Sequence, residues 1–145
     1  MTMSIEEISD RLEIQDLMVR YSYALDFQDW EAMEALFTPD ATVDYSEMGG
    51  SKGDMQTTTE FLRSTMPTFP SYQHMVTTSE IKVDGDTARV RTILHNPMVL
   101  GEGDQPDLML CGLWYLDTLV RTPDGWKFKE RVEKKSYMRI LPGKK

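Results

Sequence analysis

The stretch RYSYALDFQDWEAMEALFTPDATVDYS, residues 20–46, decides the fold. Its first part completes an apolar stripe of helical spacing, formed by Ile14, Leu17, Met18, Tyr21 and Leu25. Asp26 comes where this helix ends, and Asp29 then looks like the N-cap of a short second helix that carries Met33, Leu36 and Phe37. An acid at a helix C-terminus costs about 0.3–1 kcal/mol, so Asp26 needs a reason to be there.

The pattern after this stretch changes from helical to strand-like. Pro39 in TPDA ends the second helix, residues 41–48 read as a strand and residues 55–67 as a third helix. We expect the remaining strands at 71–83, 87–100, 107–121 and 126–140, with a mobile acidic loop at 101–107. Helices followed by a strand meander indicate an α+β fold in one domain, residues 1–145. The expected shape is a cone-shaped α+β barrel, in which a curved, mostly antiparallel sheet wraps over the N-terminal helices around a pocket.

Composition excludes several classes of function. The net charge of −8 and the pI near 4.7 argue against a nucleic-acid partner and against binding to anionic membranes. No apolar run approaches the ~18 residues of a membrane span, and the N-terminus lacks a secretory signal. The sequence has two histidines and one cysteine, Cys111, without ligand spacing, which argues against a metal site. A single cysteine cannot form a disulfide within the chain. We therefore expect a cytoplasmic protein.

Candidate chemical groups are few. By strand alternation His74 shares a face with Tyr72 and Val76, whereas His95 points outward and Asn96 inward. On spacing alone His74 is either a hydrogen-bonded core histidine or a base, and Asp26 either a loop cap or a catalytic acid. The default position for Tyr21 and Tyr45 is the core.

The quoted stretch resembles the opening of the nuclear transport factor 2 superfold, in its SnoaL-like branch. The segments QHMVTTSEIKVDGDTARVRT and DGWKFKERVEKKSYMRILP extend the resemblance over nearly the whole chain. Within the branch the chain is most similar to small cofactor-independent lyases, namely scytalone dehydratase, hexachlorocyclohexane dehydrochlorinase and bile acid 7α-dehydratase. These enzymes have an Asp at the end of the first helix and a His on the facing strand.

The resemblance implies that Asp26 and His74 form a catalytic dyad, which would explain the acid at the helix end. It also implies substrate contacts for Tyr21, Tyr45 and Arg139. Two positions depart from the relatives. Asn96 stands where the bile acid enzyme has an Asp, and Leu25 replaces a tyrosine of scytalone dehydratase.

The function expected from this resemblance is a dehydratase-type elimination on a small apolar, polycyclic or steroid-like molecule, with His74 as the base and no cofactor. The expected pocket lining is Met18, Leu25, Phe37, Met66, Met98, Leu110 and Trp114. Two alternatives stay open: an isomerase like ketosteroid isomerase, and a non-catalytic ligand-binding or assembly subunit. Because residues 107–121 are apolar on both faces, we also expect a homodimer or homotrimer through the sheet.

Overall fold

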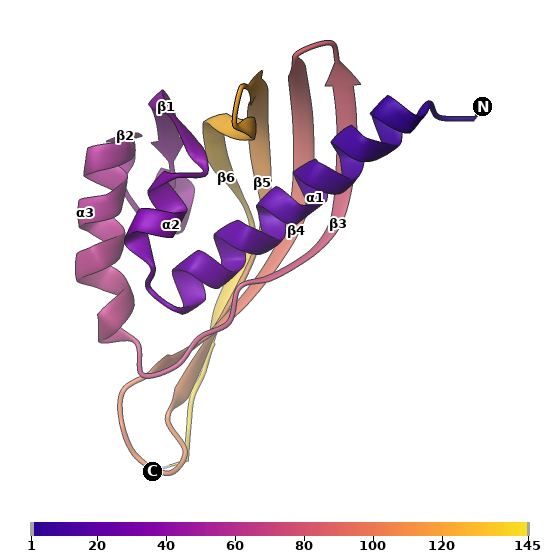
Figure 1. Ribbon diagram of the computed structural model, residues 1–145. Coiled ribbons are helices and arrows are strands. Elements are labelled where there is room, and N and C mark those ends of the chain that lie inside the picture. The colour runs from indigo at the N-terminus through magenta and orange to yellow at the C-terminus, as the bar shows by residue number, and fades with distance from the viewer. Residues whose placement is uncertain (1, 145) are drawn as a thin grey trace.

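The protein folds into a curved sheet with its helices on one face (Figure 1). The structure is a computed structural model that describes residues 2–144. The helices are α1 (Ile5–Asp26), α2 (Trp30–Glu34) and α3 (Met55–Thr65), with 3₁₀ turns η1 (Ser46–Met48) and η2 (Met66–Thr68). The strands are β1 (Phe37–Asp44), β2 (Lys52–Asp54), β3 (Met75–Asp84), β4 (Thr87–Leu100), β5 (Asp107–Thr122) and β6 (Gly125–Leu141). This arrangement confirms the α+β fold expected from the sequence.

Helix α1 lies across the concave face of the sheet (Figure 1). Its N-terminus is capped by Ser4, whose Oγ accepts a 3.1 Å hydrogen bond from the Glu7 amide. The predicted apolar stripe is the buried face, with Ile14, Leu17, Met18, Tyr21 and Leu25 each at most 2% exposed. Among the described residues no helix is long and apolar enough to cross a membrane.

Within residues 2–144, six strands form one sheet in the order β2-β1-β6-β5-β4-β3. Every neighbouring pair is antiparallel except β1 and β6, which are parallel. The long strands β4, β5 and β6 run past the helix layer at the end of the sheet near the C-terminus (Figure 1). The helices therefore cover one face of the sheet only, and the opposite face carries exposed apolar side chains, including Ile93 and Leu116.

Three local predictions were wrong. Phe37 begins β1 instead of ending a helix, and Pro39 lies within that strand. Proline has no N–H for a ladder, and the pairing of β1 with β6 shifts register between Phe37 and Thr42. Residues 71–74 precede β3 and touch the sheet through one bridge, Tyr72 to Met98. The strand predicted over residues 41–48 ends at Asp44, and η1 takes the place of its last residues.

A buried ion pair lies in the core under α1. Arg131 and Asp117 are both fully buried and share two 2.8 Å hydrogen bonds. The guanidinium also lies 4.2, 3.7 and 4.1 Å from the ring centroids of Tyr21, Tyr115 and Phe128. Burial disfavours the guanidinium charge, but the Asp117 carboxylate outweighs this and holds the pKa of Arg131 above its ordinary value.

Candidate active site

The end of α1 directs Asp26 towards the segment that precedes β3. Asp26 is the last residue of the helix, and Gln28 then takes a left-handed conformation with φ 55°. Asp29 caps α2 by accepting a 3.0 Å hydrogen bond from the Ala32 amide. The chain thus reverses within three residues, and the Asp26 carboxylate projects beyond the helix end.

His74 is held by Asp26 at two points. Its backbone amide lies 3.1 Å from both carboxylate oxygens, and its ring Nδ1 lies 2.7 Å from Asp26 Oδ1. A carboxylate only accepts hydrogen bonds, so Nδ1 carries the proton and Nε2 keeps its lone pair in the neutral ring. The acid at the helix end is therefore used as an acceptor that fixes the tautomer of His74.

Asn96 of β4 approaches the other ring nitrogen. Its Nδ2 lies 3.3 Å from His74 Nε2 and donates to it. The Asn96 side chain is buried, and its Oδ1 has no hydrogen-bond partner among residues 2–144. As predicted from strand alternation, Asn96 points inward and His95 lies on the opposite face, where its Nδ1 is 2.7 Å from the Tyr137 hydroxyl.

A cavity of about 230 Å³ lies in front of the His74 ring, between α3, η1 and the sheet. His74, Asn96, Tyr45, Thr65 and Glu133 are its polar side chains. The remaining side chains are apolar: Leu25, Met48, Phe61, Leu62, Met66, Phe69, Met98, Met109, Cys111, Leu113 and Met138. Asp26 does not line this cavity but lies behind His74, on an outer groove that Tyr23 and Phe27 also border.

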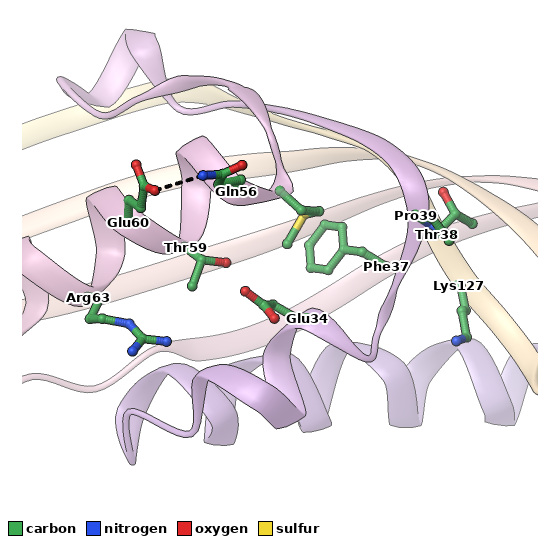
Figure 2. Close-up of a pocket in the computed structure, with 10 residues that line it drawn as sticks. Glu34, Phe37, Thr38, Pro39, Gln56, Thr59, Glu60, Arg63 and Lys127 are labelled. Atoms are coloured by element: carbon green, nitrogen blue, oxygen red, sulfur yellow. Dashed lines mark hydrogen bonds between the residues drawn. The ribbon is translucent and has the colours of Figure 1, made fainter.

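A larger depression of about 700 Å³ lies elsewhere, between α2, α3 and β1 (Figure 2). It is bordered by side chains such as Glu34, Phe37 and Arg63, and contains neither histidine. By size alone, this depression would be chosen as the candidate functional site. The smaller cavity is the better candidate site because it combines a tautomer-fixed histidine with an apolar lining.

Several predicted pocket residues line the cavity, and two lie just behind it. Leu25, Tyr45, Asn96, Met66 and Met98 border it directly. The Tyr21 hydroxyl is hydrogen-bonded to that of Tyr45, and burial raises the pKa of Tyr21 to about 12. Met18 is in the core, where its Sδ accepts from Arg131 at 3.1 Å.

Four other predicted residues lie away from the cavity. Trp114 pairs with Ile93 and Lys134, and Leu110 pairs with Arg139, all on the outer face of the sheet. Directly opposed residues share a face, so Trp114, Leu110 and Arg139 cannot reach the inner cavity. Phe37 borders the depression of Figure 2 instead. The error on β5 arose because this strand is apolar on both faces, which leaves no alternation to show that Cys111 and Leu113 point inward.

Glu133 was not predicted, because its orientation depends on an irregularity in the pairing of β5 with β6. The pairing of β5 with β6 shifts register where Thr118 opposes Glu130 and Leu119 opposes Phe128. This bulge at residue 129 inverts the alternation as far as the second register shift, between Lys135 and Tyr137, so that Arg131 and Glu133 point inward. Plain alternation from Phe128 would have placed both outward.

Within residues 2–144 no three His, Cys, Asp or Glu side chains are arranged to hold a metal ion.

Comparisons with known proteins agree with this architecture. The SnoaL-like domain family model matches residues 6–132. An uncharacterized protein of Mycobacterium tuberculosis is 45% identical over 139 residues, covering 96% of this chain and 94% of its own. A protein of Novosphingobium aromaticivorans provisionally named as an aromatic ring hydroxylase is 28% identical, with a TM-score of 0.82 over 92% of this chain and 94% of its own. A second protein of that species, provisionally named as a scytalone dehydratase, is 24% identical, with the same TM-score of 0.82 over 94% of this chain and 91% of its own. With its family model, its fold and its relatives in agreement, the chain belongs to the SnoaL-like domain family, as the resemblance of its sequence predicted.

Proposed function

We propose that the protein is a cofactor-independent lyase that eliminates water from a small apolar substrate, with Asp26 and His74 as its dyad. The observation that carries this proposal is the position of the His74 ring. Its Nδ1 is bonded to a carboxylate at 2.7 Å, and its Nε2 lies on the cavity side beside Asn96.

His74 acts as the general base. Nε2 takes the acidic proton from the carbon next to a carbonyl group. The Asn96 amide moves away from Nε2 when this substrate carbon binds there. Asp26 stabilises the imidazolium that forms, and the Tyr45 hydroxyl can donate to the carbonyl oxygen, where negative charge develops. General-base catalysis of this kind typically contributes ~10²–10⁴-fold.

The cavity volume limits the substrate. An engineered apolar cavity of roughly 150 Å³ binds benzene. A cavity of about 230 Å³ therefore has room for one ring with a short substituent. We favour a monocyclic or open-chain β-hydroxy carbonyl compound over the steroid-like molecule expected from the sequence, because a polycyclic substrate would require the cavity to widen.

The test uses the aldol adduct of benzaldehyde and acetone, a monocyclic β-hydroxy ketone whose dehydration gives a conjugated, ultraviolet-absorbing enone. His74→Gln and Asp26→Asn should each lower turnover by ~10²-fold or more while circular dichroism shows a folded protein. His95→Gln is the matched control, since His95 is on the outer face, bonded to Tyr137. Equal turnover in His74→Gln and His95→Gln would refute the role of the dyad. A product of unchanged mass would indicate isomerisation instead.

A further inference from the structure

Glu133 is an acid in the cavity that the dyad does not use. It lies on the inner face of β6, directly opposite Tyr115 of β5, and lines the same cavity as His74 and Asn96. The bulge of β6 turns this side chain inward, between the buried core and the cavity wall. A carboxyl in this position can reach a ligand held in front of His74.

In the part of the chain that the structure describes, the Glu133 carboxyl is unpaired. Within residues 2–144 it accepts no hydrogen bond and forms no salt bridge, and the only cation acting on it, Arg131, is already paired with Asp117. Its cavity neighbours are mainly apolar, among them Leu113 and Met138. An isolated carboxylate is costly in such surroundings, whereas a neutral carboxylic acid is not.

The charged and titratable groups around Glu133 also leave its neutral form favoured. They are Tyr21 of α1, Tyr45 before η1, Cys111 and Tyr115 of β5, Arg131 of β6, and His74 across the cavity. Burial raises the pKa of Glu133 to about 8, and the charge of Arg131 only partly opposes this. At neutral pH the group is therefore mostly the acid, able to donate a proton.

We propose that Glu133 is the general acid of the cavity, and that it protonates the hydroxyl group that leaves while His74 removes the proton from carbon. This proposal rests on the elimination proposed above. It also specifies the substrate class: an uncharged β-hydroxy carbonyl compound whose hydroxyl group contacts Glu133.

The step balances without a further reactant. Nε2 of His74 takes the proton, the C–H electron pair becomes the new C=C bond, and the C–O bond breaks. The departing oxygen takes the proton of Glu133 and leaves as water. The imidazolium and the Glu133 carboxylate then restore their starting states when one proton returns from His74 to Glu133 through water in the cavity.

The first experiment is the pH profile of kcat/KM with the benzaldehyde–acetone adduct. In the parent protein activity should fall as the pH rises through about 8, because Glu133 loses its proton. Glu133→Gln should lose ~10-fold or more at neutral pH, and this fall at high pH should disappear. Glu130→Gln, the same change at an exposed position of β6, should keep the parent profile. If kcat/KM of Glu133→Gln still falls at high pH while His74→Gln is inactive, the role of Glu133 is overturned and the role of the dyad stands.

The second experiment does not depend on turnover. Binding of 1-phenylethyl methyl ether, whose ether oxygen stands in for the leaving hydroxyl group as a hydrogen-bond acceptor, is followed by ligand-observed NMR. Its affinity should weaken several-fold in the parent protein between pH 6 and 9.5, because the Glu133 carboxylate no longer donates to this oxygen. In Glu133→Gln the affinity should be independent of pH, since the amide keeps a donor. A pH-independent affinity in the parent protein would overturn the proposal for Glu133. A pH-dependent affinity without turnover of the adduct would support Glu133 as the donor to the ligand and count against elimination.

Discussion

Replacing Glu133 by glutamine should make the protein more stable at alkaline pH. Burial raises the pKa of Glu133 from 4.5 to about 8 in the folded protein. The unfolded chain loses this proton near pH 4.5, so between pH 4.5 and 8 the folded state binds more protons than the unfolded state. Stability from this group is fully present below pH 4.5 and is lost as the pH rises through 8.

The size of the effect follows from the pKa difference. At 1.36 kcal/mol per pH unit, a difference of about 3.5 between 4.5 and 8 corresponds to ~5 kcal/mol. This is an upper limit, because the side chain borders a cavity that water can enter; we expect ~2–3 kcal/mol after that screening. Near pH 4 the carboxylic acid and the amide have similar shape and charge, so the two proteins should differ by less than ~1 kcal/mol.

The assay is urea unfolding of the parent protein, Glu133→Gln and Glu130→Gln at intervals from pH 4 to 9.5. Other titrating groups are common to the three proteins and cancel in the differences. The advantage of Glu133→Gln should grow between pH 4.5 and 8 and then level off. A difference that stays flat over this range, or one that Glu130→Gln reproduces, would refute the reasoning.

Three further predictions concern stability and assembly. Asp26→Asn should lower the free energy of unfolding, measured in urea, by ~1–2 kcal/mol, because an amide cannot replace all the hydrogen bonds that the carboxylate accepts from His74. Removing the acid from the helix C-terminus offsets only part of this loss. An unchanged or raised free energy of unfolding would contradict the prediction. Asp117→Asn should lower the free energy of unfolding by ~3 kcal/mol or more, measured by thermal melting, since it leaves the Arg131 charge buried without its partner. A decrease of less than ~1 kcal/mol would contradict this prediction. We also propose that the outer face of the sheet, where Leu116 is exposed, forms the interface of a homodimer or homotrimer. Leu116→Lys should then lower the mass of the particle measured by light scattering at micromolar concentration. A parent protein that is already monomeric would refute this interface.

The sequence predicted the parts of the fold that have a clear period. The stripe from Ile14 to Leu25 is buried as expected, and the inward position of Asn96 followed from the alternation of β4. The contact between Asp26 and His74 came from a resemblance, since nothing local relates two residues 48 positions apart. Such a contact depends on how α1 docks against the segment before β3.

The misplaced residues have a common physical origin. Trp114 and Arg139 lie on long strands whose faces cannot be assigned from polarity, because β5 is apolar on both sides and the end of β6 extends beyond the helices. Glu133 lies after a bulge, which inverts the alternation without a glycine or proline to mark it. A register shift depends on the pairing of two strands, so it can be read only from the sheet.

The hydrogen bonds between the His74 amide and Asp26 make it possible to measure how often the site opens. The segment before β3 has few other backbone bonds to the sheet: Gln73 donates to Pro97 at 3.2 Å, and Val99 donates to Ser71 at 2.8 Å. Amide exchange at His74 therefore requires this short tether to detach from the end of α1, and the same opening separates the imidazole from its carboxylate. The exchange rate of one amide proton measures how often the folded protein loses its dyad, even when no substrate is known.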